Sequence, residues 1–236
     1  MNWDICKKTI LKTASIAIFA ILFYTACDDN GVKVVTPEVE TFEDKRDGKI
    51  YKKVRIGDQI WMAENLRYEA DGSVCNDVGW WNPPSACEYY GRLYDWNTAM
   101  NGEHSSNSVP SGVEGVCPVG WHIPSDAEWT ELIDYVGVNA GTKLKAREFH
   151  DNTTIKAPDG TDKYRFSALP GGRASYIDGV CQSGSTGTSA SWWSSTERES
   201  DDRAAWIREI YQNRTEVLRW YMNKHEDFLS LRCVHD

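Results

Sequence analysis

The segment that most constrains the fold of this chain is residues 117–124, which read Cys-Pro-Val-Gly-Trp-His-Ile-Pro. A helix start follows at once. The Ser125 hydroxyl can accept a hydrogen bond from the Glu128 amide while the Glu128 side chain reaches back to Ser125, which forms a capping box. Apolar residues then recur on one helical face, at Trp129, Leu132, Ile133 and Val136. Because Gly137 can supply the left-handed stop of a helix end, we expect a helix from Ser125 to Gly137 that packs on a sheet.

Local patterns predict the other elements. Residues 50–56 and 59–63 flank Gly57-Asp58 and indicate a β-hairpin, with Ile50, Val54 and Ile56 on its apolar face and Tyr51 on the other. The spacing of apolar residues over 93–100 is compatible with a short helix. Candidate strands follow at residues 164–166, 192–193, 205–211, 217–221 and 228–234. Two helices followed by antiparallel strands predict an α+β domain.

Four further segments, in order, accompany residues 117–124: residues 56–66, 166–173 (Phe-Ser-Ala-Leu-Pro-Gly-Gly-Arg), 192–197 (Trp-Trp-Ser-Ser-Thr-Glu) and 229–234 (Leu-Ser-Leu-Arg-Cys-Val). This set resembles the bacterial Fibrobacter succinogenes major paralogous domain, a family similar to the C-type lectin and formylglycine-generating-enzyme folds. The resemblance implies a single C-type lectin-like domain with two short helices and twisted antiparallel strands, stapled by disulfides.

The N-terminus predicts export and lipidation. Three lysines precede an uncharged apolar or small run at residues 14–26, which would cover about 20 Å as a helix, less than the roughly 30 Å of a bilayer core. Residues 24–27 (Tyr-Thr-Ala-Cys) resemble a lipobox, so we expect a signal peptide at 1–26 and a diacylglycerol- and palmitate-bearing Cys27. The alternative is an ordinary signal peptide with an incidental cysteine. A flexible tether at 27–44 would then lead into the domain at 45–236.

The lipid anchor would hold the protein at a membrane, and we expect the bacterial outer membrane or cell surface; the alternative is retention at the inner membrane, which Asp28 after the modified cysteine can signal. The chain has a formal net charge of −9. Removal of residues 1–26 takes away three lysines and one aspartate, so the remaining chain would carry −11. An acidic balance opposes nonspecific binding to nucleic acid or to anionic lipid, and we expect neither as a partner.

Five cysteines follow Cys27, and their spacing is not that of a zinc site: Cys75, Cys87, Cys117, Cys181 and Cys233. An oxidising compartment favours pairing, but five cysteines cannot all pair within one chain. The family resemblance implies bridges Cys75–Cys87 and Cys117–Cys233. Cys181 would remain, in a state that the sequence leaves open.

No pattern of catalytic or metal-binding residues is found in the sequence. The five histidines lack ligand spacing, and His122 belongs to the structural segment at 117–124. The calcium motifs of sugar-binding C-type lectins do not occur, and Cys233 alone cannot form the paired cysteine site with which formylglycine-generating enzymes hold copper. We therefore expect a protein that is not an enzyme and holds no metal or cofactor.

Aromatic residues are the best candidates for binding. Trp80, Trp81 and Asn82 lie in a proline-containing loop between Cys75 and Cys87, where stiff indoles can stack on sugar rings or fill a pocket in a protein. The alternative is that they pack over the domain edge. Two pairs in predicted strands, Trp192-Trp193 and Trp220-Tyr221, are weaker candidates. We expect a non-catalytic, lipid-anchored envelope protein that binds polysaccharide; the alternative is a structural or assembly role with an envelope protein as partner.

Overall fold

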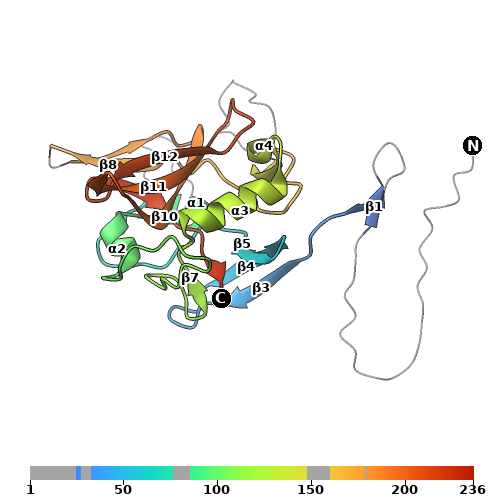
Figure 1. Ribbon diagram of the computed structural model, residues 1–236, viewed down its shortest axis with the longest axis horizontal. Coiled ribbons are helices and arrows are strands. Elements are labelled where there is room, and N and C mark those ends of the chain that lie inside the picture. The colour runs from blue at the N-terminus through green and yellow to red at the C-terminus, as the bar shows by residue number, and fades with distance from the viewer. Residues whose placement is uncertain (1–24, 28–32, 77–85, 148–159, 179) are drawn as a thin grey trace, which may run out of the picture.

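The computed structural model describes residues 25–27, 33–76, 86–147, 160–178 and 180–236. Its α+β architecture has two large, mostly antiparallel sheets and four short helices (Figure 1). A two-stranded ribbon, β1 (Thr25–Cys27) with β2 (Lys33–Val35), precedes them. Most of the predicted signal peptide lies outside the described residues.

The five-stranded sheet has the order β3-β4-β5-β14-β7. Its strands are β3 (Val39–Glu43), β4 (Ile50–Ile56), β5 (Gln59–Met62), β14 (Val234–His235) and β7 (Trp121–His122). The hairpin of β4 and β5 confirms that prediction. The sheet begins at Val39, within the segment expected as a tether, because β3 pairs with β4 along its whole length. Asp44 is also buried there and forms an ion pair with Arg46 at 2.7 Å, so the predicted boundary at residue 45 falls inside folded structure.

The seven-stranded sheet has the order β12-β11-β10-β13-β8-β9, with β6 paired to β13. Its strands are β6 (Leu93–Tyr94), β8 (Arg173–Ile177), β9 (Val180–Gly184), β10 (Ser189–Arg198), β11 (Asp201–Tyr211), β12 (Leu218–Asn223) and β13 (Asp227–Ser230). The strand predicted at 164–166 is absent, because Arg165 and Ser167 both have positive φ. The strand predicted at 228–234 is two strands, since the chain leaves β13 and crosses to the other sheet as β14.

The helices are α1 (Ala86–Tyr90), α2 (Trp96–Met100), α3 (Asp126–Val136) and α4 (Ala140–Leu144). The capping box of Ser125 and Glu128 is confirmed, and Gly137 ends α3 with φ of 71°. The expectation of two helices was too low. The helix predicted over 93–100 begins only at Trp96, because Leu93 and Tyr94 pair in β6 and Asp95 caps the helix.

Helix α3 lies between the two sheets (Figure 1). Its Trp129 packs against Trp61 of β5 and Trp192 of β10. One apolar cluster surrounds it, and a second contains Tyr51, Trp193 and the Cys117–Cys233 region.

The predicted faces of β4 were partly wrong: Tyr51 is fully buried and Ile50 is 61% exposed. Both faces of the central part of β10 are covered, so Trp192 and Trp193 are each buried and neither is available to a ligand.

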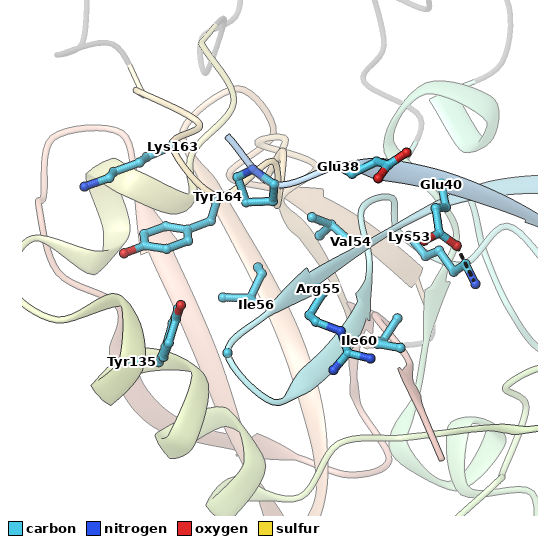
Figure 2. Close-up of a pocket in the computed structure, with 12 residues that line it drawn as sticks. Glu38, Glu40, Lys53, Val54, Arg55, Ile56, Ile60, Tyr135, Lys163 and Tyr164 are labelled. Carbon is cyan, nitrogen blue, oxygen red and sulfur yellow. Dashed lines mark ion pairs between the residues drawn. The ribbon is translucent and has the colours of Figure 1, made fainter. Parts of the chain in front are cut away.

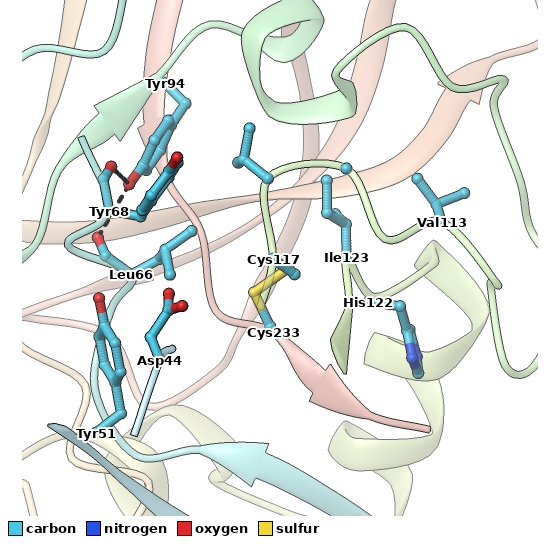
Figure 3. The surroundings of a disulfide bond; sticks show 12 residues. Asp44, Tyr51, Leu66, Tyr68, Tyr94, Val113, Cys117, His122, Ile123 and Cys233 are labelled. Carbon is cyan, nitrogen blue, oxygen red and sulfur yellow. Dashed lines mark hydrogen bonds between the residues drawn. A yellow bond between two sulfur atoms is a disulfide. The ribbon is translucent and has the colours of Figure 1, made fainter. Parts of the chain in front are cut away.

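Both predicted disulfides are present. Cys117–Cys233 joins residues 116 positions apart with a Cα–Cα distance of 6.1 Å, and it lies beside Ile123 within the core (Figure 3). Cys75–Cys87 closes a short loop with a Cα–Cα distance of 5.2 Å. Cys181 is a free thiol, exposed on β9. Two disulfides suggest an extracytoplasmic protein. Among the described residues, no helix is long and apolar enough to cross a membrane.

Candidate functional site

The first predicted binding residues, Trp80, Trp81 and Asn82, lie outside the described residues. The structure resumes with α1, which contains Cys87 and is joined through it to Cys75. In this helix Tyr89 is 48% exposed and Tyr90 is buried. The exposed Tyr89 therefore lies seven positions after Asn82 in the sequence.

The exposed aromatic residue of the other candidate pairs is Trp220, on edge strand β12, with 57% of its surface accessible. Register pairs Trp193 with Ile207 and Ile207 with Trp220. Because directly paired residues point to the same face of a sheet, Trp220 continues at the surface an apolar row whose other two members are buried. The ring of Tyr221 is already in a cation–π contact, because the Arg198 guanidinium lies 3.8 Å from its centroid.

A polar row lies next to this apolar row. Register pairs Ser191 with Glu209 and Glu209 with Leu218. The Glu209 side chain is buried, its Oε1 accepts a hydrogen bond from Ser191 Oγ at 2.9 Å, and Arg173 Nη1 lies 3.6 Å from the same oxygen. Burial and the neighbouring Glu209 carboxylate raise the pKa of Tyr211. The carboxylate is thus held in one place by groups from three strands.

We call this surface the Trp220 face. It encloses about 450 Å³ and is lined by Arg173, Glu209, Tyr211, Asn213, Arg214, Leu218, Trp220 and Met222. It combines an exposed indole with a fixed carboxylate acceptor and guanidinium donors. Sugar hydroxyls both donate and accept hydrogen bonds, and the C–H face of a pyranose ring stacks on indole, so this set of groups is suited to a neutral glycan.

A second hollow, a groove of about 580 Å³, lies beside edge strand β3 (Figure 2). Val54 and Ile56 are its buried apolar residues. Tyr135 and Tyr164 lie on one side, with ring centroids 6.0 Å apart in an edge-to-face arrangement, and the Glu40–Lys53 ion pair lies on the other. The groove therefore combines buried apolar residues with two tyrosines that contact each other, and Glu38, Arg55 and Lys163 add further charged groups to its lining.

His122 has both ring nitrogens occupied. Nδ1 lies 2.7 Å from Asp236 Oδ1 and Nε2 lies 2.7 Å from Glu128 Oε1, and the side chain is buried. Burial lowers the pKa of His122, but the hydrogen bonds and charges of the two carboxylates outweigh it, so the pKa is raised. The histidine has a structural role, since it links Asp236, the residue after β14, to Glu128 of α3. No three His, Cys, Asp or Glu side chains converge as a metal site in the part of the chain that the structure describes.

The fold is that of a disulfide-stapled α+β protein, and the Trp220 face lies on its larger sheet. Residues 54–235 match the Fibrobacter succinogenes major domain, and the chain belongs to that family. No curated protein and no solved structure matches it.

The sequence pointed to Trp220 only weakly, and it gave only one sign of the polar neighbours of this residue. Arg173 and Glu209 lie on different strands, and only the register of β10 with β11 and the return of β8 bring them together. Alternating polar and apolar residues in β11 were the one available sign, because they placed Glu209 on the same side as Ile207.

Proposed function

We propose that this chain is a non-catalytic, lipid-anchored envelope protein whose extracytoplasmic domain binds polysaccharide. The observation that carries the proposal is the Trp220 face, where an exposed indole adjoins a buried, hydrogen-bonded carboxylate. Lipidation at Cys27 would hold the domain at the outer membrane or cell surface, where polysaccharides are available. A C-type lectin-like fold is part of the same proposal, supported by the long-range Cys117–Cys233 bridge.

Binding of glycans to the full-length chain tests this proposal, first on a glycan array and then by titration with the best ligand. We expect Trp220→Ala to weaken binding at least tenfold, about 1.4 kcal/mol, because the stacking surface is lost. Tyr135→Ala is the matched control: it removes an equally exposed aromatic residue from the groove of Figure 2 and should bind like the wild type. Far-ultraviolet circular dichroism and urea unfolding would establish that both variants fold.

A double variant, Trp80→Ala/Trp81→Ala, tests the binding loop predicted from the sequence. Loss of binding in this variant but not in Trp220→Ala would move the site to that loop. Absence of saturable binding of any glycan to the folded wild type would contradict polysaccharide recognition.

The second candidate function is an envelope assembly role with a protein partner, and the groove beside β3 favours it. Its apolar residues lie next to an edge strand, and such edges can accept a strand from another chain. In that case Tyr135→Ala, and not Trp220→Ala, would abolish capture of the partner by the full-length chain.

A further inference from the structure

A separate cavity of about 120 Å³ has a charge opposite to that of the whole chain. We call it the basic pocket. Three of its lining residues are cations, Lys52, Arg67 and Arg232, and one is an anion, Glu64. The formal charges of these four residues sum to +2. The sum is still +1 when Glu88, 3.6 Å from Arg67, is included. The chain as a whole carries −9, so this concentration of positive charge is local.

Arg232 is the deepest of these cations, with 1% of its surface accessible. Its Nε and Nη2 donate to Asn65 Oδ1 at 3.1 and 2.8 Å, Nη1 donates to the Phe166 carbonyl, and the guanidinium lies 4.2 Å from the Phe166 ring centroid. Within the described residues no carboxylate lies at ion-pair distance, and Glu64 and Asp162 act on it only from farther away. All its protein partners are neutral.

A buried cation without a counter-ion is costly, and the cost is visible here because burial lowers the pKa of Arg232 to about 9. A guanidinium has five N–H donors, and the contacts above use three of them. Asn65 cannot accept further hydrogen bonds from Arg232, because its oxygen also accepts one from Trp192. Its amide nitrogen is a donor and is already used by the Tyr90 carbonyl at 2.8 Å. The remaining donors can serve a ligand in the cavity.

The other two cations are only loosely neutralised. Arg67 lies 3.7 Å from Glu64 Oε1, and Lys52 Nζ lies 3.9 Å from the same oxygen, so neither contact is a hydrogen bond. Lys52 is also mostly exposed. The other carboxylate oxygen of Glu64 is also in use, because Oε2 accepts a hydrogen bond from the Lys52 backbone amide at 2.8 Å.

The lining residues also favour a particular kind of anion. Tyr89 lines the pocket with 48% of its surface exposed, its ring held edge-on against Tyr90 at 4.8 Å. A cavity of about 120 Å³ has room for a carboxylate beside Arg232. A pyranose ring that carries this carboxylate can then stack on the exposed Tyr89.

We propose that the basic pocket binds the carboxylate of an acidic sugar, a hexuronate residue of a glycan, whose ring stacks on Tyr89. Arg232 and Arg67 donate hydrogen bonds to the carboxylate oxygens, and Lys52 contributes charge at the entrance. This site shares no lining residue with the Trp220 face and does not depend on it.

Calorimetric titration of the full-length chain with trigalacturonate, and with neutral maltotriose as the reference sugar, tests this site. We expect trigalacturonate to bind at least tenfold more tightly than maltotriose, and its affinity to fall as salt rises from 0.05 to about 0.5 M because the contact is electrostatic. Arg67→Gln should weaken binding at least tenfold, and Lys52→Gln and Tyr89→Ala should weaken it severalfold.

Arg55→Gln is the matched control. It removes one positive charge from an exposed position of β4 that does not line the basic pocket, and it should bind trigalacturonate like the wild type. Lys52 and Tyr89 are exposed, so their variants keep the test valid if Arg67→Gln does not fold.

Three results would overturn the proposal: absence of saturable trigalacturonate binding by the folded wild type, equal binding in Lys52→Gln, Tyr89→Ala and Arg55→Gln, or tighter binding of phosphate, sulfate or acetyl-dialanine. If trigalacturonate does not bind but Trp220→Ala still weakens glycan binding, the proposal of neutral glycan binding at the Trp220 face stands. Failure of Trp220→Ala to alter glycan binding would not affect the result with trigalacturonate.

Discussion

At the residue scale, this protein keeps several charges inside and satisfies each of them differently. His122 lies between two carboxylates, whereas Arg232 has amide, carbonyl and aromatic partners. The first arrangement neutralises the charge within the chain and fixes β14 on α3. The second leaves a cation without an anion, which is why we assign a structural role to His122 and a binding role to Arg232.

The raised pKa of His122 predicts a pH dependence of stability. The folded state binds the proton more tightly than the unfolded chain, so this contribution is full below the unfolded pKa of about 6.5 and is lost as pH rises through the higher folded pKa. We expect the urea midpoint to fall over that range and this fall to be absent in His122→Gln.

His225→Gln is the control for that measurement, because His225 is an exposed histidine that hydrogen-bonds to Asn97. This variant should retain the wild-type pH profile. An identical decline in His122→Gln would show that the pH dependence arises elsewhere.

At the element scale, patterns that depend only on neighbouring residues were predicted well. The β4–β5 hairpin and the α3 capping box follow from turn and cap chemistry, and both are present. Predictions failed where distant contacts decide. Tyr51 is buried because Phe42 of β3 and Arg67 cover it, and neither contact is visible in the alternation of residues 50–56.

The same limit applies to the candidate sites. Trp220 could be identified as an aromatic residue in a strand, but Glu209 and Arg173 become its neighbours only through strand register. Arg232 lies in a segment whose structural importance was predicted. Its position in a cavity depends on the crossing of residues 231–233 between the sheets, where Leu231 and Cys233 carbonyls accept hydrogen bonds from Leu66 and Met62.

The capping box makes a quantitative prediction for α3. Ser125 is fully buried, and its hydroxyl accepts from the Glu128 amide at 3.1 Å. Ser125→Ala should lower the free energy of unfolding by about 1 kcal/mol, within the 0.5 to 2 kcal/mol typical of lost caps. Urea unfolding measures the change. Ser108→Ala, at an exposed loop position, should change it by less than about 0.5 kcal/mol, and equal effects of the two variants would refute the role of the cap.

At the scale of the whole molecule, the two disulfides differ in what they restrain. Cys75–Cys87 closes 12 positions and Cys117–Cys233 closes 116. The chain-entropy argument assigns about 3 kcal/mol to the short loop and about 5 kcal/mol to the long one, before any difference in the folded state. Both cysteines of the long bridge lie in one core cluster, close to the place where the chain changes sheets.

Replacement of Cys117 and Cys233 by alanine should therefore destabilise the protein more than replacement of Cys75 and Cys87. Urea unfolding of the two double variants under non-reducing conditions measures the difference. The reference is the single variant Cys181→Ser, which keeps both disulfides and lacks the free thiol. A larger loss on removal of the short bridge would contradict the entropic account.

Strand β14 occupies an interior position of the five-stranded sheet, between β5 and β7. Strands β5 and β7 are synthesised well before residues 234–235, so the sheet has a gap between them until β14 is added. Until then the hydrogen-bonding edges of β5 and β7 and the Cys117 thiol have no partner. Folding from the N-terminus as the chain emerges cannot finish this layer. A nascent chain halted before Cys233 would remain open to proteases and to mispairing with Cys181, and any chaperone that serves this protein must act until the final strand arrives.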